Sequence, residues 1–275
     1  MNNFDSHTVE GFGDEWSRFD QKELSKTELL ALFNSYFQNF PFGSLPKNSV
    51  GFDLGCGSGR WAALVADRVG SLHCIDASSA ALNVARRNLQ AKNNCHFHLA
   101  SVDQIPLAND SMDFGYSLGV LHHVPDTLLG IKSCVSKLKK GAPFLIYLYY
   151  RFDNRAWWFS TLWRISDQIR RIVSRCPMQL RYILSQIIAF SIYWPLARLS
   201  RALERLGLPV DSFPLSSYRS LSFYTMRTDA LDRFGTRLEQ RFTRAEIEKM
   251  LLNSGLEKII FNEQAPYWCA IGFKR

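Results

Sequence analysis

Short apolar runs alternate with segments of helical periodicity through the first half of the chain. Between the runs, apolar residues recur every three or four positions, as on the buried face of an amphipathic helix. The runs occupy residues 49–54, 72–76, 95–99, part of 111–126, and 142–150. The last is almost entirely apolar, which is typical of a strand buried on both faces of a parallel sheet. The alternation predicts an α/β fold with a doubly wound, mostly parallel sheet that binds ligand at its carboxyl edge.

The segment before this region has a different pattern. Ser25 and Glu28 have the spacing of a capping box, and apolar residues follow at helical spacing. We therefore expect residues 1–47 to form an N-terminal helical cap. Residues 12–19 contain two aromatics besides Phe12 and either pack on the core as a surface turn or cover the ligand site.

The pattern returns near the other end of the chain. A second capping box, Thr243 with Glu246, opens a helix, and strand-like runs follow at 256–261 and 267–273. The α/β core is thus expected to comprise residues 48–150 and 242–275. Residues 151–241 would then be an insertion after the fifth strand.

A glycine-rich loop follows the first strand. After Asp53, glycines alternate at 55, 57 and 59, and a helical pattern follows from Trp61. Alternating glycines let a ligand approach the backbone closely, and the helix start offers free N–H groups. A dinucleotide fingerprint would need glycine at the sixth loop position, where this chain has Arg60. The second strand ends in Asp76, an acid placed to accept hydrogen bonds from both hydroxyls of a ribose.

The order acid-x-Gly-x-Gly-x-Gly resembles motif I of class I S-adenosylmethionine-dependent methyltransferases. Residues 111–126 resemble the fourth-strand motif of the same family. The chain resembles the small-molecule type and is similar to methyltransferases like those of ubiquinone and menaquinone biosynthesis. The resemblance covers about residues 48–150 and 242–275. It implies S-adenosylmethionine as the cofactor, bound by Asp53, Gly55, Cys56, Gly57, Gly59, Asp76, Ala77, Ser101, Val102, Asp103, Leu118 and Gly119.

The residue that binds the adenine stays open. In the family, the loop after the third strand holds the adenine, often through an acid whose place is taken here by Ser101. Either Ser101 with the Val102 backbone or Asp103 fills that role.

Methyl transfer depends mainly on alignment of the acceptor with the methyl group, but a hydroxyl or ammonium acceptor must also lose a proton. His122 and His123, after the fourth strand, are the candidate catalytic bases; alternatively, both only hold the loop. His123 with Asp126 is too few ligands for a metal, and no metal site is expected.

The insertion holds nearly all of the net charge. From residue 151 to 209 there are ten Arg, no Lys, two Asp and one Glu, a net of +7 against +8 for the chain. Forked guanidinium groups beside aromatic rings suit a planar anion, so we expect a helical lid that binds a small, lipid-like or sugar-like, anionic acceptor. Its candidate acceptor-binding residues are Tyr150, Arg151, Arg155, Tyr218, Tyr224 and Arg227; alternatively, they pin the insertion to the sheet by ion pairs.

Residues 182–197 are uncharged but short and interrupted for a transmembrane helix, and the arginines that flank them suit a helix at a membrane surface. Peripheral membrane contact and a homodimer are therefore further expectations. A nucleic-acid partner is not expected, because residues 118–121 lack the Asn/Asp-Pro-Pro-aromatic motif of nucleic-acid amino-methyltransferases.

The six cysteines have no zinc or disulfide spacing, and the N-terminus has no signal-peptide pattern, so a cytoplasmic location is expected. Two other functions stay open. One keeps the fold and cofactor but performs cyclisation or aminopropyl-type transfer. The other is a non-catalytic scaffold that docks on a membrane or a partner.

Overall fold

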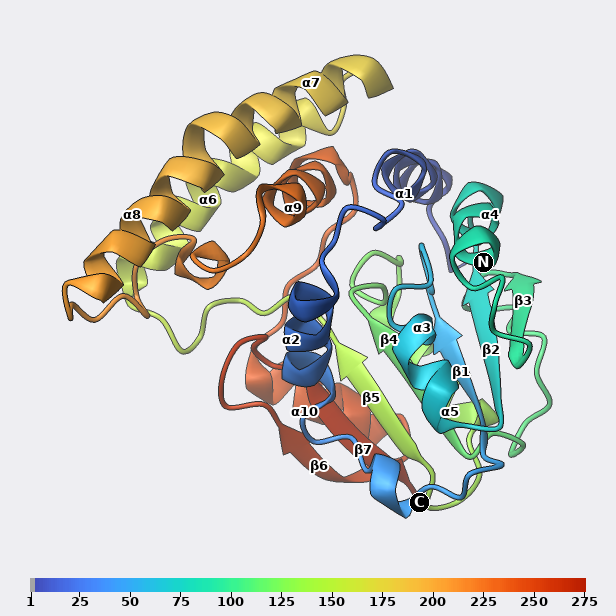
Figure 1. The fold of residues 1–275 in the computed structure, drawn as a ribbon. Coiled ribbons are helices and arrows are strands. Elements are labelled where there is room, and N and C mark those ends of the chain that lie inside the picture. Colours follow the sequence, from blue (N-terminus) through green and yellow to red (C-terminus); the bar gives the residue numbers. More distant parts are fainter. Residues whose placement is uncertain (1–2) are drawn as a thin grey trace. The chain divides into compact units, whose positions relative to one another are not determined.

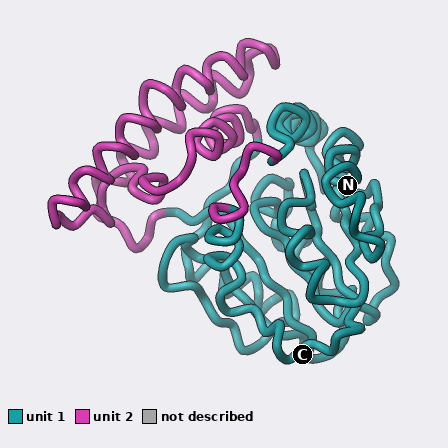
Figure 2. Tube along the Cα trace, viewed as in Figure 1, with its two compact units in different colours: residues 1–21, 29–151, 238–275 teal, residues 22–28, 152–237 magenta. Residues whose placement is uncertain are grey.

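The computed structural model describes residues 3–275, which form two compact units (Figure 2). Unit 1 comprises its described residues up to 21, together with 29–151 and 238–275. Unit 2 comprises residues 22–28 and 152–237. Unit 2 therefore takes most of the expected 151–241 insertion and a short piece of the expected N-terminal cap.

Unit 1 is built on one seven-stranded sheet with the order β3-β2-β1-β4-β5-β7-β6. All neighbouring strands from β3 to β5 pair in parallel, and β7 runs antiparallel to both β5 and β6. The strand order reverses between β1 and β4, which is the switch point where doubly wound sheets bind ligands. The strands are β1 (Val50–Leu54), β2 (Ser71–Asp76), β3 (Cys95–Leu99), β4 (Phe114–Leu118), β5 (Pro143–Tyr147), β6 (Leu256–Phe261) and β7 (Ala270–Lys274).

Two apolar layers cover the sheet. On one face, Phe33, Trp61 and Leu82 bring helices α2, α3 and α4 onto the sheet. On the other face, Ile131 and Ile247 bring α5 and α10. Figure 1 shows these helices around the sheet, with α1 beside α4. Their bounds are α1 (Ser6–Arg18), α2 (Lys26–Phe37), α3 (Ala62–Val65), α4 (Ser79–Asn88), α5 (Thr127–Lys137) and α10 (Arg244–Asn253).

Polar residues begin several helices, and the expected Thr243 capping box is among them. Of the other expected box, the Glu28 N–H donates to the Ser25 hydroxyl, but the Glu28 carboxylate binds Ser222 and Thr225 instead. Ser78 and Asp126 accept hydrogen bonds from the backbone N–H groups of Ala81 and Leu129, and Thr243 forms the full capping box with Glu246. These caps satisfy N–H groups that a helix cannot pair internally. Because the caps fix where α4 and α5 start, they also fix the loops at the carboxyl edge of the sheet.

Two elements differ from the sequence expectation. The helical pattern that follows Trp61 in the sequence forms only one α-helical turn. This helix, α3, ends at Val65, and the chain continues as a 3-10 turn, Ala66–Arg68. The last strand begins at Ala270 instead of 267, because the Asn262 N–H donates to the Cys269 oxygen and closes a hairpin loop between them.

Unit 2 is helical. A small core that includes Val173, Tyr193, Met226 and Phe234 lies between its helices, and α9 packs against both α6 and α7. The helices are α6 (Trp157–Val173), α7 (Met178–Ile188), a π-helical turn (Ala189–Tyr193), α8 (Trp194–Arg205), a 3-10 turn (Ser216–Tyr218) and α9 (Phe223–Gly235). The continuous helix Met178–Arg205 is the one described segment whose length and composition would allow it to cross a membrane, and 28% of its apolar window is buried.

Candidate functional site

The glycine loop leaves β1 at the switch point of the sheet. Gly55, Gly57 and Gly59 have φ angles of +75°, +54° and +78°, a region that side chains with a Cβ rarely adopt. The N–H groups of Gly55 and Cys56 both donate to the carbonyl oxygen of Ile75, at 2.7 and 3.1 Å. The loop is therefore held against the end of β2.

Asp76, at the end of β2, holds the same loop from the side chain. Its Oδ2 accepts a hydrogen bond from the Gly57 N–H at 2.9 Å, and its Oδ1 accepts one from the Ser78 N–H at 2.8 Å. Burial raises the pKa of this carboxyl, against the lowering effect of these N–H bonds. Each carboxylate oxygen has a second lone pair, so Asp76 keeps the capacity to bind two hydroxyl donors.

A cleft opens at these elements, with an empty volume of about 770 Å³ including its mouth. Its walls are mainly apolar, with a few polar groups that come from several elements. Of the predicted cofactor residues, it is lined by Gly55, Asp76, Ala77, Ser101, Val102, Leu118 and Gly119.

The remaining predicted cofactor residues do not line this cleft. Cys56, Gly57 and Gly59 belong to the loop behind its wall, and Asp103 accepts a hydrogen bond from the Ser101 hydroxyl at 2.6 Å. Asp53 is 1% exposed, and burial raises its pKa to about 8 although the neighbouring Tyr116 hydroxyl lowers it. Ser101 and Val102 thus face the cleft directly, while Asp103 acts on it through Ser101.

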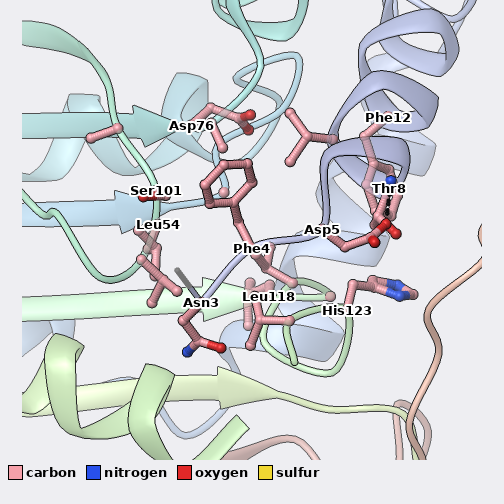
Figure 3. A pocket seen from close by; sticks show the side chains of 18 of the residues that line it. Asn3, Phe4, Asp5, Thr8, Phe12, Leu54, Asp76, Ser101, Leu118 and His123 are labelled. Atoms are coloured by element: carbon pink, nitrogen blue, oxygen red, sulfur yellow. Dashed lines mark hydrogen bonds between the residues drawn. The ribbon is translucent and has the colours of Figure 1, made fainter. Parts of the chain in front are cut away.

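The N-terminal segment forms a further wall of the cleft, of which the sequence had indicated only residues 12–19, as one of two alternatives. Asn3 is tied to the start of α5, because its amide donates to the Asp126 oxygen and accepts from the Asp126 N–H, both at 2.8 Å. Figure 3 shows the Phe4 ring directed into the cleft between Asp76 and Ser101. Six residues of this region line the cleft besides Phe4: Asn3, Asp5, Thr8, Val9, Phe12 and Trp16.

Two features of the sequence could have indicated this wall. Residues 6–18 have an amphipathic helical period, and Phe4 is an isolated aromatic residue in a polar N-terminus. Of the aromatics in 12–19, Phe12 and Trp16 line the cleft, whereas Phe19 is 2% exposed and does not.

The two predicted catalytic histidines have different surroundings. His123 lines the cleft, and its Nδ1 lies 2.6 Å from the carbonyl oxygen of Leu238. His122 is fully buried, stacks on Tyr149 at 3.8 Å between ring centroids, and has no hydrogen-bond partner among the described residues. Burial, with His123 and Arg241 nearby, lowers the pKa of His122 well below its usual value. Only His123 is therefore placed at the cleft.

None of the six predicted acceptor-binding residues is among those that line this cleft. In unit 1, Tyr150 packs on Tyr267, and Arg151 binds Glu246 and the Arg241 oxygen. In unit 2, Arg155 donates to the carbonyl oxygen of Asp211, and the Tyr218 hydroxyl donates to the Asp229 carboxylate. Arg227 donates to the side-chain oxygens of Gln186 and Tyr182. Tyr224 is 9% exposed. Their part in binding an acceptor stays a prediction.

The cleft suits S-adenosylmethionine. Asp76 offers acceptors for ribose hydroxyls, Ser101 and Val102 offer a polar edge beside an apolar wall, and the positive φ angles of the loop keep side chains away from the ligand. No group of three or more histidine, cysteine or acidic side chains that could hold a metal occurs in the described part of the chain.

Comparison with known proteins identifies the central region. Residues 52–146 match the protein family described as a methyltransferase domain. The chain is 30% identical over 111 residues to phosphoethanolamine N-methyltransferase 2 of Caenorhabditis elegans, which covers 39% of this chain and 25% of that protein. It is 31% identical over 111 residues to a tRNA (carboxymethyluridine(34)-5-O)-methyltransferase of Saccharomyces cerevisiae, which covers 38% and 37%. The chain thus matches about a quarter to just over a third of the length of these relatives.

Among solved structures, an S-adenosylmethionine-dependent methyltransferase of Thermotoga maritima aligns with 96% of this chain and 100% of that chain, with a TM-score of 0.51 at 14% identity. At that identity the likeness concerns the fold. The predicted doubly wound sheet and the predicted family resemblance are both confirmed. Residues 52–146 thus carry a methyltransferase domain, and the sheet to which they belong has the fold of class I S-adenosylmethionine-dependent methyltransferases.

Proposed function

We propose that the protein transfers the methyl group of S-adenosylmethionine to a small acceptor that has an anionic group and an apolar part. The observation that carries the proposal is the cleft at the switch point, where Asp76, Ser101 and the glycine loop meet an apolar wall. When bound there, S-adenosylmethionine supplies an electrophilic methyl group on a sulfonium. The protein then has to align the acceptor and exclude water, since alignment accounts for much of the rate of such a displacement.

Each cleft residue has a role in this proposal. Asp76 accepts hydrogen bonds from the ribose hydroxyls while the Gly57 and Ser78 N–H groups keep its carboxyl in place. Ser101 and Val102 contact the adenine, and Asp103 orients the Ser101 hydroxyl. The apolar side chains of Phe4, Phe12 and other N-terminal residues exclude water from the cofactor.

His123 has the tautomer that a general base needs. A carbonyl oxygen only accepts hydrogen bonds, so the contact with Leu238 places the ring proton on Nδ1 and makes Nε2 the basic nitrogen of the neutral ring. In our proposal, Nε2 takes the proton that a hydroxyl or ammonium acceptor loses. His122 positions this ring, because the two imidazole centroids are 3.9 Å apart and His122 is packed on Tyr149.

We infer the negative charge of the acceptor from the arginine content of unit 2. Residues 152–237 contain thirteen Arg, no Lys, five Asp and one Glu, a net of +7. Phosphoethanolamine, which appears in the name of the Caenorhabditis relative, is a small molecule that has such an anionic group. We propose that Arg155 and Arg227 of unit 2 bind such a group, with Tyr218 and Tyr224 of the same unit as further contacts of the acceptor.

Product analysis tests the proposal. The protein is incubated with methyl-labelled S-adenosylmethionine and, separately, phosphoethanolamine, a total lipid extract, a neutral metabolite extract and bulk tRNA. We expect label in a small or lipid anionic product together with S-adenosylhomocysteine. Label in tRNA alone, methylthioadenosine as the product, or no turnover with any acceptor would each contradict the proposal.

Histidine variants then test the assigned base. His123→Ala should lower kcat by about 100-fold, a typical contribution of a general base, without a comparable loss of cofactor affinity. The control is His7→Ala, because His7 is a histidine of α1 whose side chain is 59% exposed and which does not line the cleft. Wild-type kcat for His123→Ala from pH 6 to pH 9 would remove His123 as the base and leave alignment alone.

A further inference from the structure

Unit 2 carries most of the exposed large apolar side chains of the described residues. Of the 22 such side chains, sixteen lie between Trp157 and Leu208, including Trp157 at 81% exposure, Ile172 at 69% and Phe190 at 67%. Single exposed apolar residues are ordinary on a protein surface, but a concentration of this size marks an interaction site.

On α6, five of the six exposed large apolar residues form one continuous stripe. They are spaced four, three, four and three residues apart, which places them on one side of a helix. The stripe consists of Trp158, Leu162, Ile165, Ile169 and Ile172, all between 38% and 69% exposed.

The helix that follows α6 has a similar stripe. Its members are again spaced three and four residues apart: Leu180, Ile183, Ile187, Phe190 and Trp194. They run from α7 through the π-helical turn to the start of α8. Figure 1 shows α6 lying alongside α7, which it contacts. The two stripes therefore belong to neighbouring helices of the same unit.

Two charged side chains of α6, those of Asp167 and Arg170, lie on its inner side. Asp167 and Arg170 are both 6% exposed and form an ion pair at 2.7 Å, and Arg170 also donates to the carbonyl oxygens of Thr236 and Arg237 at 2.9 Å. A buried charge is stable only with such partners, so these contacts fix which side of α6 faces inward. The apolar stripe is consequently held outward by the fold of unit 2.

We propose that α6 and α7–α8 lie flat on an anionic lipid bilayer, with the two stripes in the interface. The charges beside the stripes favour this partner. Arg164, Arg171, Arg175, Arg201 and Arg205 are exposed along these helices. The only acids between 157 and 205 are Asp167, which is buried, and Glu204, which pairs with Arg219. Exposed tryptophans, with their amphipathic rings, suit the headgroup region as well.

The contacts of Met178–Arg205 favour a helix on the bilayer surface over one that crosses it. Ala189, Tyr193 and Ala197 are buried in the core that α9 shares, and Arg198 donates to the carbonyl oxygens of Arg219 and Leu221. A crossing helix would lose these contacts and place Arg181 and Arg198 near lipid. A second copy of the chain is a poor occupant of this surface, because it would bring together two units of net charge +7.

Vesicle flotation of the full chain tests the proposal. Vesicles of phosphatidylcholine alone are compared with vesicles that also contain about 30% phosphatidylglycerol, an anionic lipid. We expect binding only to the anionic vesicles, weakened by added salt because exposed charges are screened. The double variant Ile165→Ser, Ile172→Ser should lower the partition coefficient at least tenfold, since each isoleucine no longer transfers its apolar surface into the interface.

The matched control is Leu129→Ser on α5, because Leu129 is 45% exposed but does not belong to either apolar stripe. It should float as the wild type does. Circular dichroism confirms that each variant is folded, and the blue shift of tryptophan emission on adding anionic vesicles gives a second readout on the wild type.

Several results would overturn the proposal. These are equal binding to neutral vesicles, no binding and no emission shift with anionic vesicles, or release only by detergent and not by high salt. A homodimer by light scattering that the double variant dissociates would show that a second copy covers the surface instead. Because neither S-adenosylmethionine nor an acceptor is present, this test can fail while the proposed methyl transfer holds.

Discussion

Gly57 is constrained both by its backbone and by its surroundings. Its φ of +54° is costly for any residue with a Cβ, and a Cβ there would lie 2.8 Å from the indole of Trp16. We therefore expect Gly57→Ala to lose about 1–2 kcal/mol of stability and more than tenfold in S-adenosylmethionine affinity. Thermal denaturation and calorimetric titration measure the two effects.

Gly43 provides the control for this change. It has no positive φ, and a Cβ there would meet nothing within 4 Å. Gly43→Ala should therefore leave both quantities unchanged. If Gly57→Ala binds the cofactor as tightly as Gly43→Ala does, the loop is not the cofactor-binding element.

Asp53 should make the fold less stable as the pH rises. Its pKa is about 8 in the folded protein and about 3.8 when unfolded, so the folded state holds a proton that the unfolded state has lost between these values. Stability therefore falls with increasing pH across this window, by up to about 1.4 kcal/mol per pH unit. Asp53→Asn should be more stable than the wild type at pH 8, and by a larger margin than at pH 5.

Urea denaturation at the two pH values checks this prediction. Asp110→Asn is the control, because the Asp110 side chain is 70% exposed. An Asp53→Asn stability difference that is the same at pH 5 and pH 8 would contradict the raised pKa.

At the scale of the element, α6 depends on its buried ion pair. Replacing Arg170 leaves the Asp167 carboxylate buried and removes donors from the Thr236 and Arg237 carbonyls. We expect Arg170→Met to cost about 3–5 kcal/mol of unfolding free energy. Arg171→Met is the matched change, since Arg171 also binds Asp167 but is 56% exposed, and it should cost less than about 1 kcal/mol. Similar losses for both variants in urea denaturation would contradict this account of α6.

The elements also show what could be predicted from the sequence. Strands β3 and β6 occupy the predicted residues, because apolar alternation and turn signals are local. In the sequence, apolar residues recur at helical spacing only from about 163 to 173 within α6, and this spacing does not show which side faces inward. That orientation depends on the carbonyl groups of Thr236 and Arg237, more than sixty residues away in the chain.

At the scale of the whole molecule, one side of the cleft depends on local sequence signals and the other on contacts between residues far apart in the chain. The glycine loop and Asp76 were predictable because motif spacing on consecutive strands determines where they meet. The wall formed by Asn3 and Phe4 was not, since it depends on a contact between Asn3 and Asp126 across 123 residues. Likewise, the sequence paired His122 with His123, but tertiary packing buries one ring and places only the other at the cleft.

Calorimetric titration of the full chain with S-adenosylmethionine, and separately with NAD, shows whether the cleft is an S-adenosylmethionine site. We expect saturable binding of S-adenosylmethionine, none of NAD, and loss of binding in Asp76→Ala but not in the control Asp110→Ala. The Asp76 change should matter because it removes the ribose acceptors and frees the Gly57 and Ser78 N–H groups. Tight NAD binding with no S-adenosylmethionine binding, or unchanged affinity in Asp76→Ala, would contradict this expectation.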